Sequence, residues 1–254
     1  MNCAPIDSSA ALKGKESHMK SIVAAFKFLT ILSRLIRSEP NAPMVGKAAG
    51  FFPVVGLVLG VSLAILARAL QNYVDVEILS TILVAFLILV TGGLHLDGLK
   101  KTFDAPGLRQ SIVGSEPSSS AIGIVAIVLV VLFKIKSIDI LEEKLTLALL
   151  LTPVMARWAL LIFIYGSHRH SEGDASIIAA NVKFWHIVFA TIATLAPATY
   201  LLGHTALWIG LSLSILALLC RTLFYKRTGA LTRDNLGAVV EWSEALSLVL
   251  MASL

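Results

Sequence analysis

Charged residues are scarce in this chain. Of its 254 residues only 15% are Asp, Glu, Lys or Arg, whereas a soluble domain carries about 25%. Hydrophobic residues make up 57% of the sequence, and the mean hydropathy is +0.84. The apolar residues form long blocks rather than amphipathic stripes, which is typical of helices that cross a membrane. These features argue against a soluble domain and predict an all-α, polytopic membrane protein.

Cysteine is also scarce. The sequence contains two, Cys3 near the N-terminus and Cys220 within an apolar block. This spacing indicates neither a disulfide framework nor a zinc or iron–sulfur site. The glycine-rich segments lack the strand–turn–helix context of a nucleotide-binding loop, and the basic residues are not interleaved with aromatic ones. We therefore expect no nucleic-acid partner.

The N-terminal segment, residues 1–20, lacks the apolar core of a signal peptide. Because it is polar and of mixed charge, we expect a disordered tail there. Residues 21–254 are expected to form a single membrane-embedded domain. Translation from Met19, just before the first apolar block, is an open alternative.

Seven apolar blocks approach the length of about 20 residues that a bilayer requires. They lie at residues 48–70, 78–96, 121–137, 144–165, 184–203, 204–222 and 236–254. The earlier block at 22–36 is shorter and contains Lys27 and Arg34, so we expect an interfacial or re-entrant helix. Gly56 and Gly60 in the first span form a small-x-x-x-small pair, which allows two helices to pack closely.

Positive charge distinguishes the two sides of the predicted bundle. Lys and Arg are concentrated before the first span and in the loops at 97–120, 166–183 and 221–236, whereas the loops at 71–77 and 138–143 are acidic. The positive-inside rule then places the basic loops in the cytoplasm. Arg68, Lys134 and Lys136 lie on the opposite side, and we expect their side chains to extend outward to water.

The run at residues 91–104 (TGGLHLDGLKKTFD) carries the clearest functional signal. Asp97 directly follows an apolar span, and Asp104 comes seven residues later. Carboxylates at the end of a membrane segment are costly unless they bind a cation or take part in chemistry. The neighbouring glycines and His95 leave a permissive backbone that a diphosphate and its metal can approach. The alternative is a helix end capped by ordinary polar residues.

Ionisable residues also occur inside the predicted spans. Arg157 lies within one span, and Glu241 and Glu244 lie within the last. Such groups usually pair with one another or line a polar cavity. An arginine that faces acidic residues and a metal suits an anionic substrate, because its planar guanidinium binds two phosphate oxygens. The alternative is that Arg157 pairs with Glu241 and ties two helices together.

Five segments, spread from about residue 21 to the C-terminus, resemble the cobalamin synthase family of membrane enzymes, the adenosylcobinamide-GDP ribazoletransferases. The most diagnostic segment is 92–99 (GGLHLDGL). The others are 26–32 (FKFLTIL), 47–60 (KAAGFFPVVGLVLG), 156–158 (ARW) and 229–244 (GALTRDNLGAVVEWSE). Each segment alone is weak evidence for this family, but the order and spacing of the five together are specific to it.

The resemblance implies a magnesium-dependent transferase of vitamin B12 biosynthesis in the cytoplasmic (inner) membrane, with its active site on the cytoplasmic face. It would join adenosylcobinamide-GDP to alpha-ribazole or its 5′-phosphate. A ribose hydroxyl would attack the phosphorus that bears the cobinamide arm, and GMP would leave. Membrane lipid is an expected partner, and an oligomer is an open possibility.

By the same resemblance, Mg²⁺ would be held by Asp97, Asp104 and Asp234, since this ion prefers hard oxygen ligands. Asp97, Asp104 and Arg157 would be catalytic, with Arg157 on a phosphate. Further residues are expected to bind substrate: His95, Lys101, Glu116, Asp234 and Glu241. For His95 the alternative is a structural role, as a histidine at a helix end whose ring is hydrogen-bonded within the protein.

The chain departs from the family's acidic pattern, D-G-L-A-D-x-x-D. Lys101 stands at the middle aspartate position, and Lys100 replaces a small residue. A cation there removes negative charge where a divalent ion would sit. The run at 115–120 (SEPSSS) stands where a K-D-x-R-x-G-type run is expected; Glu116 could replace that aspartate, and Lys101 could supply the missing positive charge. A divergent, inactive relative is therefore one alternative.

Two other classes of protein are also weighed. A CDP-alcohol phosphatidyltransferase-like enzyme also places aspartates near a membrane face, but the chain lacks that family's motif of four aspartates. A transporter would show paired repeats between its halves, and the sequence shows none.

Overall fold

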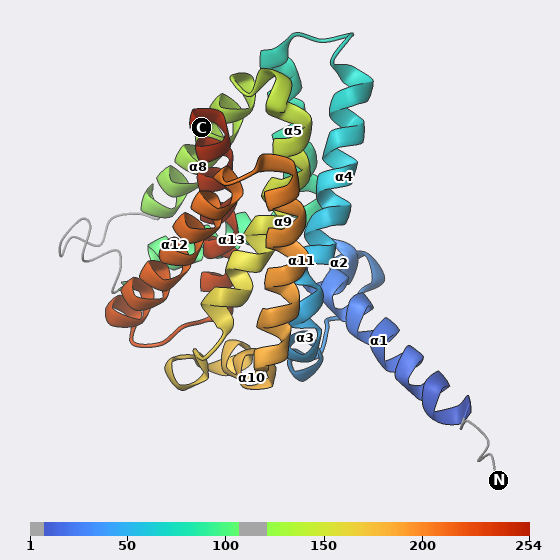
Figure 1. Cartoon of the computed structure of the whole chain (residues 1–254). Coiled ribbons are helices and arrows are strands. Elements are labelled where there is room, and N and C mark those ends of the chain that lie inside the picture. The colour runs from blue at the N-terminus through green and yellow to red at the C-terminus, as the bar shows by residue number, and fades with distance from the viewer. Residues whose placement is uncertain (1–7, 107–120) are drawn as a thin grey trace.

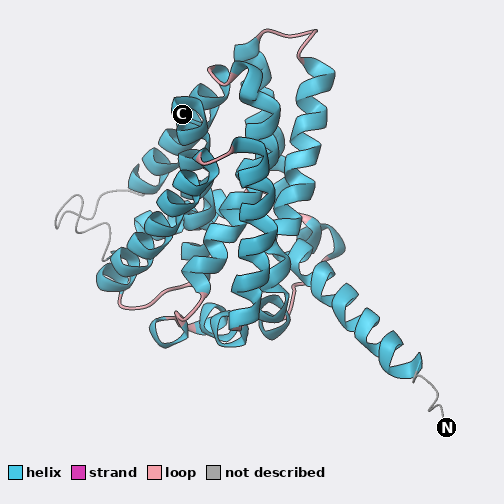
Figure 2. Ribbon diagram, viewed as in Figure 1, coloured by secondary structure: helices cyan, strands magenta, loops and turns pink. Residues whose placement is uncertain are grey.

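The computed structural model describes residues 8–106 and 121–254 of the chain (Figure 1). Within these ranges the regular elements are helices (Figure 2), and the one extended contact is an isolated parallel bridge between Ser171 and Leu231. Six helical segments of the described part are long and apolar enough to cross a membrane, and a bent pair of helices would make a seventh. The predicted all-α, polytopic class is confirmed.

The helices that qualify as spans agree closely with the predicted blocks. They are α4 (Phe52–Leu70), α8 (Ala121–Asp139), α9 (Leu145–Ile164), α11 (Phe184–Leu202), α12 (Thr205–Thr228) and α13 (Arg233–Ser253). Short helical turns extend some of them: α3 (Ala42–Ala48) and η1 (Ala49–Phe51) precede α4, and η2 (Glu142–Lys144) precedes α9. Two more, η3 (His168–His170) and α10 (Gly173–Asn181), follow α9 at the other end.

The N-terminal region differs from the expectation. Helix α1 (Ser8–Leu29) begins inside the segment expected to be a disordered tail, and it projects away from the bundle (Figure 1). Its first half contains Ala, Leu, Lys and Glu, which favour helix. Residues 1–7, which include Cys3, lie outside the described part. The short block at 22–36 forms the end of α1 and the separate helix α2 (Leu32–Ile36), and neither helix qualifies as a span.

The second predicted span is shorter than expected and ends in a sharp bend. Helix α5 (Val76–Thr91) is followed by α6 (Leu94–Asp104) at an angle of 86°. Gly92 and Gly93 between them have φ of +65° and +64°, a left-handed conformation that residues with a Cβ rarely adopt. The helix predicted at 78–96 therefore stops at Thr91, and α6 packs against α8 and α13.

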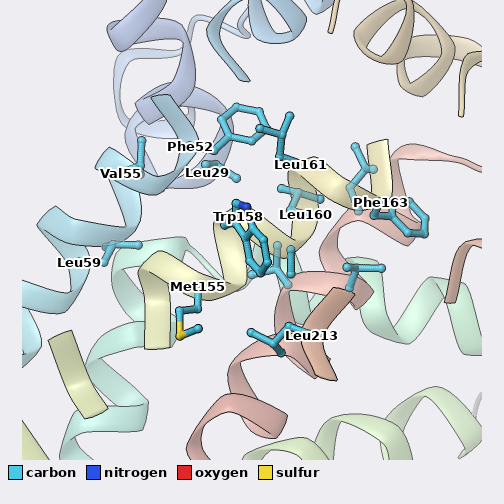
Figure 3. Close-up of a cluster of buried hydrophobic side chains, with 14 of the residues drawn as sticks. Leu29, Phe52, Val55, Leu59, Met155, Trp158, Leu160, Leu161, Phe163 and Leu213 are labelled. Atoms are coloured by element: carbon cyan, nitrogen blue, oxygen red, sulfur yellow. The ribbon is translucent and has the colours of Figure 1, made fainter. Parts of the chain in front are cut away.

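Helix α9 is the centre of the bundle and packs against α4, α12 and α13. Figure 3 shows its side chains Met155 and Trp158 among those of neighbouring helices. A Cβ on Gly56 or Gly60 of α4 would collide with the α9 backbone, at the carbonyls of Pro153 and Leu150 respectively. The predicted close packing of a helix at these two glycines is confirmed.

Helix α6 crosses the beginning of α13 at two more glycines. A Cβ on Gly98 would lie 2.7 Å from the Asp234 carbonyl oxygen, and a Cβ on Gly237 would lie 2.9 Å from the His95 carbonyl oxygen. Both distances are well below ordinary van der Waals contact. The two backbones therefore touch, which brings the first turns of both helices together.

Four buried charged side chains connect α8, α9 and α13. Lys134 Nζ lies 2.7 Å from Glu241 Oε2 and also donates to Glu244, and Arg157 Nη1 donates to the other oxygen of Glu244. All four side chains are at most 5% exposed. Two cations thus face two carboxylates, a balance that lowers the cost of burying charge.

Two expectations are corrected by this network. Lys134 does not extend outward to water, because two carboxylates inside the bundle bind its ammonium group. Arg157 does tie α9 to α13, but its partner is Glu244 rather than Glu241. Arg68 and Lys136 are exposed, as expected.

The crossing of α6 and α13 gives a first prediction. Gly98→Ala places a Cβ against the Asp234 carbonyl, so the helices must separate, and such overpacking costs about 1–3 kcal/mol. Gly50→Ala is the matched control, because its Cβ would make an ordinary contact 3.4 Å from His186. We expect Gly98→Ala to lower the free energy of unfolding in detergent micelles by that amount relative to Gly50→Ala. Equal stability of the two variants would contradict the close crossing.

The buried network gives a second prediction, tested by removing charges singly and together. Lys134→Met or Glu241→Gln alone leaves unbalanced buried charge, and each is expected to lower the free energy of unfolding by about 3–5 kcal/mol. The double variant leaves the pair of Arg157 and Glu244 balanced, so its loss should be clearly smaller than the sum of the two single losses. The three variants are compared by unfolding in mixed micelles. Additive losses would show that the two residues act independently.

Candidate active site

A pocket of about 280 Å³ lies where α6 crosses the beginning of α13. The end of α1 and the segment around α2 also contribute to its wall. Among the described residues, its ionisable lining consists of three basic, three acidic and one histidine side chain: Arg34, Lys101, Arg233, Glu39, Asp97, Asp234 and His95. The pocket is therefore strongly polar, with its charges close to balance.

Asp97 and Asp234, which lie far apart in the sequence, line this same pocket. Each belongs to the first turn of its helix, α6 or α13. The free backbone amides of a first turn favour a nearby carboxylate. The structure thus brings together two of the three residues expected to hold Mg²⁺.

Asn235, beside Asp234, fixes this arrangement and was not among the predicted site residues. Its Oδ1 accepts a hydrogen bond from the Thr232 backbone amide at 2.7 Å, which caps α13. Its Nδ2 donates to Thr102 Oγ1 on α6 at 3.1 Å, and this bond is buried. One side chain thereby holds the start of α13 in register with α6. The signal for this role was the position of Asn235 three residues after a threonine, as in a capping box.

Lys101 pairs with one of these two carboxylates. Its Nζ lies 2.7 Å from Asp97 Oδ2, one helical turn away on α6. The hydrogen bond to Asp97, followed by the negative charge of Asp234, raises the pKa of Lys101 above its ordinary value. The ammonium group is therefore fully protonated and bound to one of the expected metal ligands.

Asp104 is not part of this pocket. Its Oδ2 accepts from Lys100 Nζ at 2.8 Å, and its Oδ1 accepts from the Gly123 backbone amide at 3.0 Å. Gly123 belongs to the first turn of α8, so Asp104 caps that helix. The third expected metal ligand thus lies apart from the other two. Glu116, expected to bind substrate, lies outside the described residues.

The remaining expected residues are divided between the pocket and the network beneath it. His95 lines the pocket, is buried, and has no hydrogen-bond partner for Nε2 in the described part of the chain. Arg157 and Glu241 do not line the pocket, because both belong to the buried network between α8, α9 and α13. Arg157 is therefore placed to support the site from behind rather than to contact a ligand in the pocket.

Two arginines of the pocket were not among the expected site residues. Arg34 Nη1 donates to the Gly92 carbonyl at 3.0 Å, which anchors α2 at the bend between α5 and α6. Arg233 lies over the Phe28 ring at 5.4 Å and pairs with Glu39 at 3.3 Å. In the sequence, these two exposed arginines look like the basic residues of any loop. Only their convergence in the structure identifies them as residues of the pocket.

The pocket fits a magnesium ion that is held in part by substrate. Asp97 and Asp234 offer hard oxygen ligands from two helices, and Mg²⁺ is often bound by one or two carboxylates, with phosphates and water completing its shell. Among the described residues, no group of three or more His, Cys, Asp or Glu side chains is arranged to hold a metal by itself. One of the two carboxylates, that of Asp97, is already paired with Lys101.

A larger hollow of about 560 Å³ lies between α8, α12 and α13, and its lining is apolar, with Phe103 and Trp242 at its α6 end. It contains none of the residues expected at the site. Apart from Phe103, its lining comes from α8, α12 and α13, which are long and apolar enough to cross a membrane.

Comparison with known proteins covers nearly the whole chain. Residues 21–252 match the family model described as cobalamin-5-phosphate synthase. A protein of Caldanaerobacter subterraneus subsp. tengcongensis is 32% identical over 243 residues, which is 91% of this chain and 97% of that protein. Proteins of Thermoanaerobacter sp. (strain X514) and Pseudomonas fluorescens are each 30% identical, over 92% and 89% of this chain and 98% and 96% of their own lengths.

All three relatives are named adenosylcobinamide-GDP ribazoletransferase. No solved structure matches the chain. The matched range includes α6, the start of α13 and the pocket between them. The chain belongs to the cobalamin-5-phosphate synthase family.

Proposed function

We propose that the chain is a magnesium-dependent adenosylcobinamide-GDP ribazoletransferase. It joins adenosylcobinamide-GDP to alpha-ribazole or its 5′-phosphate and releases GMP. The observation that carries the proposal is the convergence of Asp97 and Asp234 in one pocket beside basic side chains. This is the arrangement that a diphosphate and a divalent ion require, and relatives of nearly the same length bear the name of this activity.

The reaction transfers the phosphoryl group that bears the cobinamide arm from GMP, the leaving phosphate, to an alcohol, a ribose hydroxyl of alpha-ribazole. A ribose hydroxyl of alpha-ribazole forms a new bond to the phosphorus that bears the cobinamide arm, the bond from that phosphorus to the oxygen of GMP breaks, and the hydroxyl proton is released. Such transfers need little covalent help from the protein, because positioning and charge stabilisation supply most of the rate.

The residues of the pocket divide these tasks. Arg34, Lys101 and Arg233 supply donors for the oxygens of the diphosphate. Asp97 and Asp234 would hold Mg²⁺, which neutralises charge that develops on the diphosphate. His95 lines the same pocket, and its Nε2, which has no hydrogen-bond partner among the described residues, is assigned to orient a polar group of the substrate.

We place the protein in the cytoplasmic (inner) membrane, with this pocket on the cytoplasmic side. The basic loops that the positive-inside rule assigns to the cytoplasm include the segments that build the pocket, α6 and the start of α13. Membrane lipid surrounds the spans, and a site at the boundary admits charged substrates from water.

Replacing the shared carboxylate tests the function directly. Asp97→Asn keeps the size of the side chain but removes the charge, so we expect GMP release from adenosylcobinamide-GDP and alpha-ribazole to fall by about 100-fold or more, in line with the loss of one preorganised electrostatic contact. The control is Asp75→Asn, an exposed aspartate at the opposite end of α5. GMP formed by purified membranes is quantified by chromatography. Undiminished turnover in Asp97→Asn would exclude this pocket as the reaction centre.

Asp104 gives a contrasting expectation. Because it caps α8 and lies apart from the pocket, Asp104→Ala, which removes the acceptor, should lower the free energy of unfolding by about 1 kcal/mol, as for other lost caps. Its effect on GMP release should be much smaller than that of Asp97→Asn. A loss of turnover as large as that of Asp97→Asn, with stability unchanged, would return Asp104 to the catalytic site.

The same membranes distinguish the alternative activities. They are supplied in parallel with adenosylcobinamide-GDP plus alpha-ribazole and with CDP-diacylglycerol plus an alcohol. Release of GMP supports the proposed function, whereas release of CMP supports a CDP-alcohol phosphatidyltransferase. If neither GMP nor CMP is released, the chain is an inactive relative or a transporter.

A further inference from the structure

Lys101 places a cation directly on one of the two carboxylates that would bind the metal. Its Nζ is 2.7 Å from Asp97 Oδ2, and Asp234, the other carboxylate, lines the same pocket. An ammonium group on this oxygen opposes a divalent ion on the same carboxylate, because the two positive charges repel each other. Metal binding is therefore favoured when Lys101 leaves Asp97.

The structure allows this movement at little cost. The side chain of Lys101 is 54% exposed and that of Asp97 is 48% exposed, and exposed ion pairs are weak. Lysine also carries its charge on a flexible four-carbon stem. After it leaves Asp97, however, the ammonium group is still attached to the same helical turn, where it repels a divalent ion unless it gains a negative partner.

The other two cations of the pocket have partners other than the expected metal ligands. Arg34 donates to the Gly92 carbonyl, and Arg233 is held by Glu39 and the Phe28 ring. Among the described residues, neither guanidinium group forms an ion pair with Asp97 or Asp234. Lys101 is thus the pocket cation whose partner is itself an expected metal ligand. Once it leaves Asp97, the diphosphate of a substrate can become its new negative partner.

We propose that Lys101 is a tethered cation that competes with Mg²⁺ for Asp97 and transfers to the phosphates of a nucleoside diphosphate when one binds. The pocket then binds a divalent ion weakly alone and tightly together with the diphosphate. This inference rests on the proposed function for the assignment of Asp97 as a metal ligand and for the diphosphate character of the ligand.

The test measures metal binding directly, without turnover. Mn²⁺ replaces Mg²⁺ as the probe, and bound Mn²⁺ is followed by electron paramagnetic resonance on the purified full chain in detergent, without and with GDP. A titration of Mn²⁺ with GDP alone corrects for the Mn²⁺ that GDP binds. A titration with the Asp97→Asn variant corrects for Mn²⁺ bound elsewhere on the protein. For the unaltered chain we expect GDP to tighten Mn²⁺ binding by about tenfold or more, as expected when a like charge next to the ion is neutralised.

Three variants separate the charge of Lys101 from its bulk. Lys101→Met should bind Mn²⁺ about tenfold more tightly than the unaltered chain without GDP, because the competing charge is gone, and GDP should add little more. Lys101→Arg keeps the charge and should retain the dependence on GDP. Lys100→Met is the matched control, since Lys100 pairs with Asp104 outside the pocket, and it should behave as the unaltered chain does.

The outcomes also separate this inference from the proposed function, because GMP release is measured on the same preparations. If Lys101→Met binds Mn²⁺ no better than the unaltered chain, or if Asp97→Asn changes no Mn²⁺ binding, the inference is overturned even when GMP is released. If the Lys101→Met preparation gains affinity while the unaltered chain releases no GMP, the competition stands and the proposed function fails.

Discussion

The close crossing of α6 and α13 is the contact on which the candidate site depends. Gly98 and Gly237 let the two backbones touch, and no side chain larger than hydrogen fits at Gly98 without moving the Asp234 carbonyl. Asn235 then fixes the register through Thr102. Asp97 and Asp234 face one pocket because of this geometry, not because they are near in sequence. The bend at Gly92 and Gly93 is equally necessary, since it turns α6 out of the line of α5.

The buried charges beneath the pocket follow from the same packing. Glu241 and Glu244 lie on α13 beyond its crossing with α6, and they face Lys134 of α8 and Arg157 of α9. A single one of these groups would be very unfavourable among apolar helices, but two cations with two anions form a neutral set. The set connects α8, α9 and α13. His95, which is buried at the pocket wall, lies between the pocket and this network of charges. The network therefore acts on the site through its electric field and its packing, not through contact with a ligand.

The sequence predicts the spans well because hydrocarbon imposes a simple length and composition on a helix. It also predicts the close packing at Gly56 and Gly60, since small residues four apart act through the backbone alone. The motif at 92–99 identifies Asp97 correctly as a pocket residue. What the sequence does not predict is the direction of side chains along a helix that bends. Asp104 lies two turns from Asp97 and was expected beside it, yet the first turn of α8 reaches it first and is capped by it.

Pairing inside the bundle is unpredictable from the sequence for a similar reason. Lys134 is near enough to a span end to reach water, and the expectation that it does so follows from its position alone. Only the arrangement of α8 against α13 reveals two carboxylates within hydrogen-bond distance. Arg157 likewise had two candidate partners one helical turn apart on α13, and a choice between adjacent turns depends on the relative shift of two helices, which no local pattern encodes.

The charge balance of the pocket connects these results to its chemistry. Three basic and three acidic side chains line it among the described residues, so the empty pocket has little net attraction for either a free cation or a free anion. A diphosphate and a divalent ion that arrive together keep that balance, whereas either one alone upsets it. Lys101 strengthens the constraint, because its ammonium group is bound to Asp97 and would repel a divalent ion there until a phosphate replaced the carboxylate as its partner. A lysine at a position where the family pattern has an aspartate is therefore compatible with transfer chemistry, provided that the metal enters with the substrate.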